Sequence, residues 1–190
     1  MLCNGGYDGL GKERTIEMAK AAKYMGFKGH KIIDDTKNKD GPVIWPADIV
    51  KEHVEAYLEE KKNENVEIGT IITFDDGGVS HHPNHIACHY GVMKFYDTHV
   101  KSGAPSKWAN VDVYTLETVP WYRTYNGFLD IFMSRKDQVN YYLFEPFTGI
   151  KVMMIHHTQF VWYRKLFLWF ARYVYMNGLT HYPKRVELID

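Results

Sequence analysis

The spacing of apolar side chains predicts that short strands alternate with amphipathic helices along this chain. The clearest strand is a run of β-branched and aromatic residues over positions 66–74. Shorter patterns of the same kind over positions 31–33, 111–119 and 139–144 indicate further strands. Because strands that alternate with helices are typical of parallel βαβ units, we expect an α/β fold.

Helices are predicted where apolar residues recur every three or four positions. The expected helices cover residues 12–25, 46–62, 83–99, 147–154 and 158–176. The first of them is predicted to bury the face that carries Ile16, Ala19, Ala22 and Met25. The last is expected to end at Asn177-Gly178, because glycine suits the left-handed backbone that follows many helices. Residues 121–136 are aromatic and predict no definite element.

The first residues differ from the start of a complete doubly wound sheet. Residues 1–4 have the pattern of the end of a strand, and a glycine-rich loop follows directly over residues 5–11. Since such a sheet begins with a full strand and its crossover, we expect at least one strand to be missing upstream. A length of 190 residues favours one domain. The sequence therefore predicts a single domain over residues 1–190, with a doubly wound, mostly parallel sheet and a truncated N-terminus.

Composition and charge exclude some classes of protein. Hydrophobic residues make up 45% of the chain and aromatic residues 15%, which is enough for a packed core and argues against disorder. The formal net charge is +0, so no overall positive field attracts nucleic acid. The two cysteines, Cys3 and Cys88, provide no disulfide framework. No uncharged apolar run of the length of a membrane-spanning helix occurs in the sequence.

The densest group of candidate catalytic side chains follows the predicted strand at 66–74. A polar, glycine-bearing loop covers residues 75–82, and a helix then begins at Pro83, where a missing backbone N–H is tolerated. This loop and the first turns of the helix contain four histidines and two aspartates. Because open α/β sheets place their sites outside the carboxyl ends of strands, we expect the candidate site here.

His82 and His85 are three residues apart across the start of this helix, so their side chains are expected on nearly one face. Such a pair either binds a metal, or provides one ligand and one group that polarises a substrate carbonyl. Alternatively, His82 caps the helix and His85 packs beneath the edge of the sheet. His85 and His89 have the spacing of a zincin pair, but Ile86 occupies the position where that motif needs a glutamate.

Two neighbouring polar positions also have two interpretations each. Asp75 and Asp76 either orient a histidine and contact substrate, or form the turn before Gly77-Gly78. Arg14 lies in the first turns of the helix that follows the glycine-rich loop. It either contacts a phosphate or a sugar hydroxyl, or forms an ion pair on the helix surface.

The C-terminal third adds one more histidine and an unusual helix. The polar segment 156–159 interrupts two apolar helices, so it either places His156 in a cleft or is a plain loop. Residues 160–173 are aromatic, with Arg164 and Arg172 on one face. This helix either belongs to the core, with cations that reach water along their aliphatic stems, or lies in a membrane interface, where Trp, Tyr and Arg are favoured.

Taken together and in order, several segments resemble the PIG-L family. They are residues 2–11 with Arg14 and Glu17, then Thr73-Phe74-Asp75 with Gly78-Val79-Ser80, then His82-Pro83-Asn84-His85, and finally His156 with Thr158-Gln159, Trp162, Arg164 and Arg172-Tyr173. The resemblance covers nearly the whole chain. Its Asp8-Gly9-Leu10-Gly11 and C-terminal segments favour the eukaryotic branch of GPI-anchor synthesis over bacterial thiol-sugar deacetylases.

The resemblance implies a Rossmann-like sheet and a zinc-dependent amide hydrolase. The implied reaction removes the N-acetyl group of N-acetylglucosaminyl-phosphatidylinositol and releases acetate. His85 would be a ligand of Zn²⁺, His82 would stabilise the oxyanion, and Asp8, Arg14 and His156 would bind substrate. The implied partners are this lipid and the surface of the endoplasmic reticulum membrane, with the enzyme at its cytoplasmic face and no nucleic acid.

One part of the family pattern is absent from this sequence. The family takes a second histidine ligand, an aspartate ligand and the general-base aspartate from a His-Pro-Asp-Asp motif after the first strand. Because this sequence has no such motif, we expect an incomplete zinc site, weak zinc binding and no general base within the chain. The alternative function is therefore a catalytically inactive, truncated homologue that binds a lipid-linked sugar or acts as an assembly subunit at the membrane of the endoplasmic reticulum.

Overall fold

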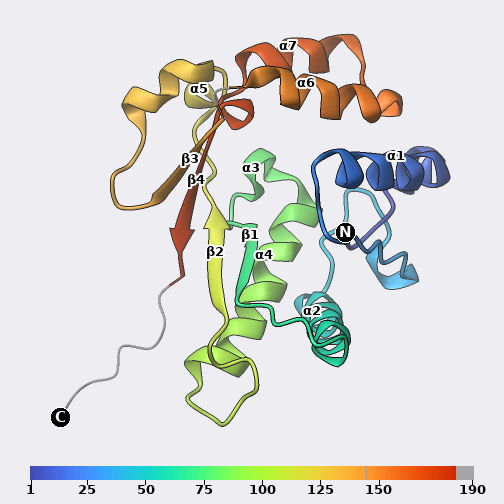
Figure 1. Cartoon of the computed structure of the whole chain (residues 1–190), viewed down its shortest axis with the longest axis vertical. Coiled ribbons are helices and arrows are strands. Elements are labelled where there is room, and N and C mark those ends of the chain that lie inside the picture. The colour runs from blue at the N-terminus through green and yellow to red at the C-terminus, as the bar shows by residue number, and fades with distance from the viewer. Residues whose placement is uncertain (144, 183–190) are drawn as a thin grey trace. The chain divides into compact units, whose positions relative to one another are not determined.

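The computed structural model describes residues 1–143 and 145–182 (Figure 1). The chain forms two compact units, each built from several segments. The first unit consists of Met1–Gly41, Val119–Arg135 and Asn140–Gly178. The second unit consists of Pro42–Thr118, Lys136–Val139 and Leu179–Asp190, of which the described part ends at residue 182.

A four-stranded mixed sheet is present, with strand order β1-β2-β4-β3. The strands are β1 (Thr70–Phe74), β2 (Asp112–Leu116), β3 (Val139–Tyr142) and β4 (Met176–His181). β1 and β2 are parallel, with Ile72 opposite Tyr114. β2 and β4 are antiparallel, with Thr115 opposite Thr180. Because β1 and β2 are parallel, their carboxyl ends meet at one edge, which is where the histidine loop begins.

Two helices of the second unit cover the β1–β2 pair. They are α2 (Ala47–Asn63) and α4 (Pro83–Tyr96), and Figure 1 shows α4 lying along β1. Ala87, Gly91 and Phe95 recur every four residues and form the buried stripe of α4. At Gly91 a Cβ atom would lie 2.2 Å from Cγ1 of Val50, so only glycine allows α2 to approach α4 this closely. A π-helical turn, Asp97–Lys101, follows α4.

The apolar core of the second unit lies between these helices and β1 and β2. Its two groups of buried residues are Leu58, Phe95, Trp108 and Val111, and Val92, Met93, Tyr96 and Val113. Partly buried Val54 and Ile71 pack against both groups and join them. The first turns of α4, which carry His82 and His85, are therefore attached to a well-packed scaffold.

The first unit is built mainly from short helices. Its α-helices are α1 (Gly11–Tyr24), α5 (Trp121–Thr124), α6 (Pro146–Ile155) and α7 (Trp162–Phe170). Its 3₁₀ turns are η1 (Gly6–Asp8), η2 (Thr36–Asn38), η4 (Gly127–Met133), η5 (His157–Gln159) and η6 (Arg172–Val174). α1 packs against α6 and η5, and η4 packs against α7 and η6.

A buried ion cluster joins three of these elements. The carboxylate of Asp130 accepts hydrogen bonds from Nε and Nη2 of Arg123 at 2.9 and 2.8 Å. The Nε atom of Arg172 lies 2.6 Å from the same carboxylate, and both Asp130 and Arg172 are fully buried. We call these three residues the Asp130 cluster. A buried charge is tolerated when it is paired and hydrogen-bonded, as here.

Most predicted elements are present, with shifted ends. The helices expected at 12–25, 46–62, 83–99 and 147–154 correspond to α1, α2, α4 and α6. The strands expected at 66–74, 111–119 and 139–144 correspond to β1, β2 and β3, while residue 144 lies outside the described residues. The expectation of a mostly parallel sheet is wrong for β4, because it runs antiparallel to β2. The prediction of a single, truncated domain stays a prediction.

The expected helix over 158–176 is also wrong. The chain there forms η5, α7 and η6, and then the strand β4, whose interior contains the proposed helix stop Asn177-Gly178. Met176 and Leu179 are buried in this strand, and its pairing with β2 provides hydrogen bonds from a segment distant in sequence. Local spacing gives no signal of such a partner, which explains the error.

Two smaller expectations fail near the N-terminus. Residues 1–4 and 31–33 form no strand, although the Met1 amine donates to the Lys31 carbonyl and the Ile33 amide donates to the Met1 carbonyl, at 2.7 and 2.8 Å. The inward face of α1 is also different, because Ile16 and Met25 are exposed while Glu17 and Ala21 are buried. The reason is that Glu17 has polar partners in η5, described below.

Candidate functional site

The loop between β1 and α4 is held in shape by Asp75 and Thr118. One carboxylate oxygen of Asp75 accepts hydrogen bonds from the Gly77 and Gly78 amides at 3.2 and 3.1 Å. The other accepts from the Thr118 amide at 2.5 Å, and the Thr118 hydroxyl also donates to the carboxylate. The interpretation of Asp75 as a turn residue is therefore confirmed, whereas Asp76 is exposed.

The same loop contains a residue in an unfavourable backbone conformation. Val79 has φ 64° and ψ −46°, which is rare for a β-branched side chain. Its amide donates to the Thr118 hydroxyl at 2.7 Å, so a side chain from the end of β2 holds this conformation. Gly78 has φ 61°, and a Cβ atom there would lie 3.0 Å from Cβ of His85. Glycine is therefore needed at the point where the loop passes over His85.

His82 is the N-cap residue of α4. Its Nδ1 atom accepts a hydrogen bond from the Asn84 amide at 3.3 Å, so the capping interpretation is confirmed. A ring nitrogen that accepts from an amide carries no proton, and in the neutral ring the proton must then be on Nε2. His82 is exposed. It can therefore donate one hydrogen bond to a group outside the protein.

His85 has the opposite arrangement of proton and lone pair. Its Nδ1 atom lies 3.0 Å from the Gly78 carbonyl oxygen, which can only accept, so Nδ1 carries the proton and Nε2 has the lone pair. The ring stacks on Phe74, with centroids 4.1 Å apart and planes 7° from parallel, as the packing interpretation predicted. Burial lowers the pKa of His85 below its usual value, with a smaller contribution from nearby His82. A lower pKa favours the neutral ring, which is the form that binds a metal.

We call His82 and His85, with the loop that supports them, the histidine corner. The two rings are adjacent, with centroids 5.1 Å apart. One ring offers a proton and the other a lone pair, which are the two groups that an acyl-transfer site needs for an oxyanion and for a metal. The Nδ1 atom of His89 lies 3.0 Å from the Phe74 carbonyl oxygen, and this contact fixes α4 to β1.

The fit of the histidine corner to zinc is partial. A metal-ligating histidine usually bonds a carbonyl or carboxylate through its other ring nitrogen, and His85 does so with Gly78. Catalytic zinc usually has three protein ligands. Over residues 1–143 and 145–182, no three His, Cys, Asp or Glu side chains come together in a way that could hold a metal ion. The described residues therefore fit one ligand of such a site, and do not complete it.

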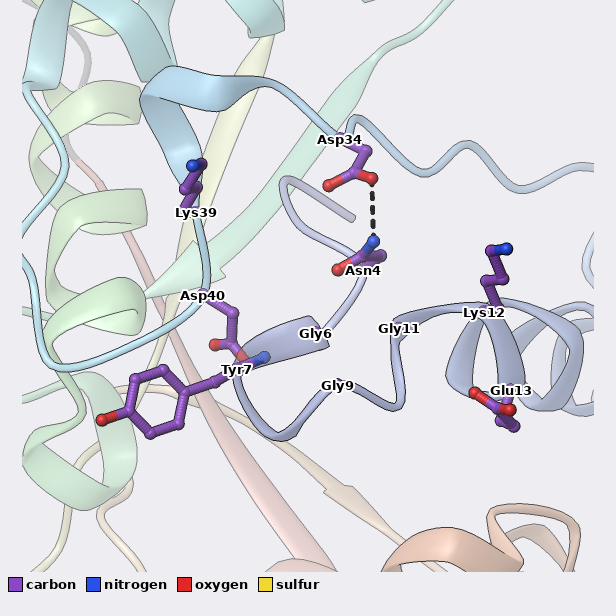
Figure 2. A pocket seen from close by; sticks show the side chains of 10 residues that line it. All are labelled: Asn4, Gly6, Tyr7, Gly9, Gly11, Lys12, Glu13, Asp34, Lys39 and Asp40. Atoms are coloured by element: carbon purple, nitrogen blue, oxygen red, sulfur yellow. Dashed lines mark hydrogen bonds between the residues drawn. The ribbon is translucent and has the colours of Figure 1, made fainter.

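The glycine-rich loop of the first unit brings Asp8 and Arg14 together. The Arg14 guanidinium lies 2.9 Å from the Asp8 carboxylate and also donates to the Gly5 carbonyl. A neighbouring cavity of about 600 Å³ is lined by residues that include Asn4, Tyr7, Lys12, Asp34 and Asp40 (Figure 2). Figure 2 shows Asn4 donating to Asp34, at 2.8 Å. The helix-surface ion pair considered for Arg14 is thus a loop contact with Asp8, and the role of both residues in substrate binding stays a prediction.

His156 lies near a buried carboxylate, that of Glu17 in α1. Glu17 accepts hydrogen bonds from the amide and hydroxyl of Thr158 at 2.8 and 2.7 Å, and Nδ1 of His157 lies 2.7 Å from it. Nδ1 of His156 is 3.8 Å from the same carboxylate, and the His156 side chain is mostly buried. We call this the Glu17 cluster. Burial tends to raise the pKa of Glu17, but Thr158 and the two histidines together lower it below its usual value.

Sequence reasoning did not assign a role to Thr118 or Glu17. Thr118 follows β2 as Asp75 follows β1, and the carboxyl ends of these parallel strands meet. A hydroxyl at this position therefore indicates a partner for Asp75. Glu17 lies one helical turn before Ala21, which is buried, and this spacing indicates that Glu17 is on the inward face of α1. His82 and His85 belong to the second unit, whereas Asp8, Arg14 and His156 belong to the first.

Known proteins resemble this chain over almost its whole length. A family model described as PIG-L, GlcNAc-PI de-N-acetylase, matches residues 3–96. A probable N-acetylglucosaminyl-phosphatidylinositol de-N-acetylase of Schizosaccharomyces pombe is 33% identical, over 94% of this chain and 71% of the relative. A bovine N-acetylglucosaminyl-phosphatidylinositol de-N-acetylase is 30% identical over 95% of this chain and 70% of the relative.

A bacterial relative shares less of the chain. The 1D-myo-inositol 2-acetamido-2-deoxy-alpha-D-glucopyranoside deacetylase of Salinispora arenicola is 29% identical over 56% of this chain and 38% of its own length. The eukaryotic relatives also match the C-terminal part, which contains α6 and α7. The resemblance noted from the sequence is thus confirmed, and the chain belongs to the PIG-L family of GlcNAc-PI de-N-acetylases.

Proposed function

We propose that this chain removes the acetyl group from N-acetylglucosaminyl-phosphatidylinositol, as part of GPI-anchor synthesis at the cytoplasmic face of the endoplasmic reticulum membrane. The names of the relatives in fission yeast and cattle support the substrate. One observation carries the chemistry: the Asn84 amide donates to His82, while His85 faces the Gly78 carbonyl, which leaves a donor on the first ring and a lone pair on the second. A donor beside a lone pair suits the hydrolysis of an amide bond.

His82 would act on the tetrahedral intermediate. When water adds to the acetamide carbonyl, negative charge develops on the carbonyl oxygen, and the Nε2–H group of His82 donates to it. A single donor of this kind usually contributes about 100- to 1,000-fold to turnover. The N-cap hydrogen bond to Asn84 fixes the ring in the required tautomer.

His85 would provide one ligand for Zn²⁺ through Nε2. The carbonyl of Gly78 orients the ring, and stacking on Phe74 limits its rotation. A bound zinc ion would supply an activated water and polarise the carbonyl. Because the described residues present one such ligand, we assign no further step to the ion.

Asp8, Arg14 and His156 would bind the sugar or the phosphate of the substrate. The Asp8 carboxylate is largely exposed and so can accept hydrogen bonds from hydroxyl groups. Arg14 keeps the glycine-rich loop in shape through Gly5 and Asp8. The His156 side chain is mostly buried, and its Nδ1 atom lies 3.8 Å from the Glu17 carboxylate.

The test is release of acetate from the lipid by the purified full chain, with added Zn²⁺ or with a chelator. Because we expect weak zinc binding and no general base within the chain, release should be slow, should require added zinc and should be lost with the chelator. His82→Asp keeps an N-cap acceptor but has no proton to donate, so turnover should fall about 100- to 1,000-fold. Its metal content should be unchanged, whereas His85→Ala should lower metal content. Exposed His30→Ala is the matched control and should alter neither.

Two outcomes would contradict the proposal. Unchanged turnover of His82→Asp would remove its role at the oxyanion. Binding of the lipid without any acetate release, with zinc present, would instead support the alternative of an inactive homologue that binds a lipid-linked sugar or helps an assembly form.

A further inference from the structure

The outer face of α7 consists of large apolar side chains that are exposed to solvent. Trp162, Leu166 and Trp169 are 73%, 52% and 56% exposed, and Tyr163 and Phe170 are also more than half exposed. At 100° per residue these five positions cover about one third of the circumference of the helix. We call them the α7 face. Its exposure argues against the interpretation of this segment as a core helix.

The opposite side of α7 is attached to the protein. Leu168 is buried, and the Arg164 guanidinium donates to the side-chain oxygen of Gln159 at 2.6 Å. The Phe167 ring contacts Tyr125 edge to face, with centroids 6.3 Å apart. These contacts fix the rotation of the helix, so the α7 face cannot turn inward without breaking them.

Neighbouring elements of the same unit also expose large apolar side chains. The turn η4 packs against α7, and α5 packs against η4. Phe132 of η4 is 84% exposed, and Phe128 and Trp121 are exposed as well. Monomeric soluble proteins rarely expose large apolar side chains grouped on one face, as on α7, so the α7 face indicates a binding surface.

Charge distinguishes between the kinds of partner that would cover this face. Residues 146–182 contain no Asp or Glu, while they contain Lys151, Arg164 and Lys165. Residues 119–135 contain a single acidic residue, Asp130, and its carboxylate is buried in the Asp130 cluster. The ammonium group of Lys165 lies 5.0 Å from the Phe160 ring centroid, at the edge of the α7 face. A surface of aromatic rings, lysine and no exposed carboxylate is complementary to anionic lipid.

We propose that the α7 face docks on the surface of a bilayer that contains anionic phospholipid. Tryptophan and tyrosine rings favour the headgroup region, and lysine adds attraction to negative lipids. α7 has nine residues, so it is about 14 Å long and lies in the plane of the interface, since the hydrocarbon core is about 30 Å thick. Over the described residues, no helix is long and apolar enough to cross a membrane.

Co-sedimentation of the full chain with vesicles tests the proposal without reference to deacetylation. We expect binding to phosphatidylcholine vesicles that contain phosphatidylserine, and weaker binding without it. The double variant Trp162→Ser/Trp169→Ser should reduce partitioning at least about tenfold, because two exposed anchors are lost. Lys165→Glu should reduce binding about fivefold or more on anionic vesicles only, and Lys165→Arg should restore it.

The matched control uses exposed aromatic residues of the same unit that lie outside the face. Tyr24 and Phe27 are both about half exposed, and Tyr24→Ser/Phe27→Ser should bind vesicles like the unmodified chain. An equal loss of vesicle binding in both double variants would overturn the proposal, because non-specific hydrophobic adsorption would then explain binding.

A measurement on the unmodified chain tests the proposal even if the variants fail to fold. Phosphatidylcholine with brominated acyl chains should quench tryptophan fluorescence if Trp162 and Trp169 enter the interface. Absence of both quenching and sedimentation would overturn the proposal. So would light scattering that shows a stable dimer dissociated by Trp162→Ser/Trp169→Ser, because a second copy would then cover the face.

Discussion

The histidine corner and the Asp130 cluster use polar side chains in opposite ways. In the histidine corner, one nitrogen of each ring is hydrogen-bonded to the backbone, and the other nitrogen is available to a ligand. In the Asp130 cluster, both carboxylate oxygens are bonded to guanidinium groups inside the protein. The Glu17 cluster resembles the latter, because both of its oxygens accept from Thr158.

The comparison shows that a residue's place in a family motif does not reveal its role. Arg172, Glu17 and Thr158 belong to the same motif set as His82 and His85, yet their bonds stay within the chain. The useful criterion is whether a polar atom remains available after the protein's own hydrogen bonds are assigned. We therefore expect Asp130 and Glu17 to affect stability, and the histidine corner to affect chemistry.

Replacement of Asp130 should have the largest effect on stability. Asp130→Ala leaves two buried guanidinium groups without their carboxylate, and removal of one partner of a buried pair usually costs about 3–5 kcal/mol of unfolding free energy. Chemical denaturation measures this loss. The control is Asp48→Ala, which breaks a largely exposed pair with Lys94 and should cost at most about 1 kcal/mol. Equal losses in the two variants would contradict the distinction drawn above.

Glu17→Gln should have a smaller effect that depends on pH. Hydrogen bonds to a charged group contribute about 1.5–3 kcal/mol, so the variant should lose roughly that much at neutral pH. The pKa of folded Glu17 is below its ordinary value of 4.5. Its contribution is therefore complete above about pH 4.5 and is lost as the pH falls through the lower folded pKa. Denaturation curves of the two proteins should converge in acid, and a constant difference at all pH values would contradict this.

Gly91→Ala tests the scaffold beneath the histidine corner. The new methyl group would meet Val50 at 2.2 Å, so α2 and α4 must separate. Overpacking of this kind costs about 1–3 kcal/mol. Gly69→Ala, where no atom lies within 4 Å of the new Cβ, should change the unfolding free energy by less than about 1 kcal/mol. Thermal or chemical unfolding of both variants gives the comparison.

The smallest expected effect separates the two roles of His82. His82→Ala removes the N-cap acceptor and should cost about 1 kcal/mol, whereas His82→Asp supplies another acceptor and should retain stability. Both variants lack the donor and should lose turnover. If His82→Asp were as unstable as His82→Ala, the capping bond to Asn84 would not explain the stability of the corner.

Local patterns predicted the parts of the fold whose burial follows sequence spacing. α2 and α4 were found because Val50 and Leu58, or Val92 and Phe95, recur at helical intervals. The cap at His82 was found because Pro83 marks the first turn of a helix. These features depend on neighbours within a few residues.

The remaining features depend on partners far along the chain. β4 pairs with β2, and Glu17 is buried because Thr158 is 141 positions away. Periodicity counts a glutamate as polar and assigns Ile16 to the interior, although the isoleucine is exposed. The outward aromatic face of α7 was one of two interpretations, because its composition alone suits a core helix equally well.

The hydroxyl of Thr118 makes the arrangement of the two histidines sensitive to the adjoining strand. It holds the Val79 amide from 39 positions away. An insertion or a bulge just after β2 would withdraw this hydroxyl, and the valine would then leave its rare conformation. A related protein can therefore retain His82, Pro83, Asn84 and His85 in unbroken order and yet lack the arrangement of the two rings. Comparisons of homologues should examine the residues just after β2 together with this motif.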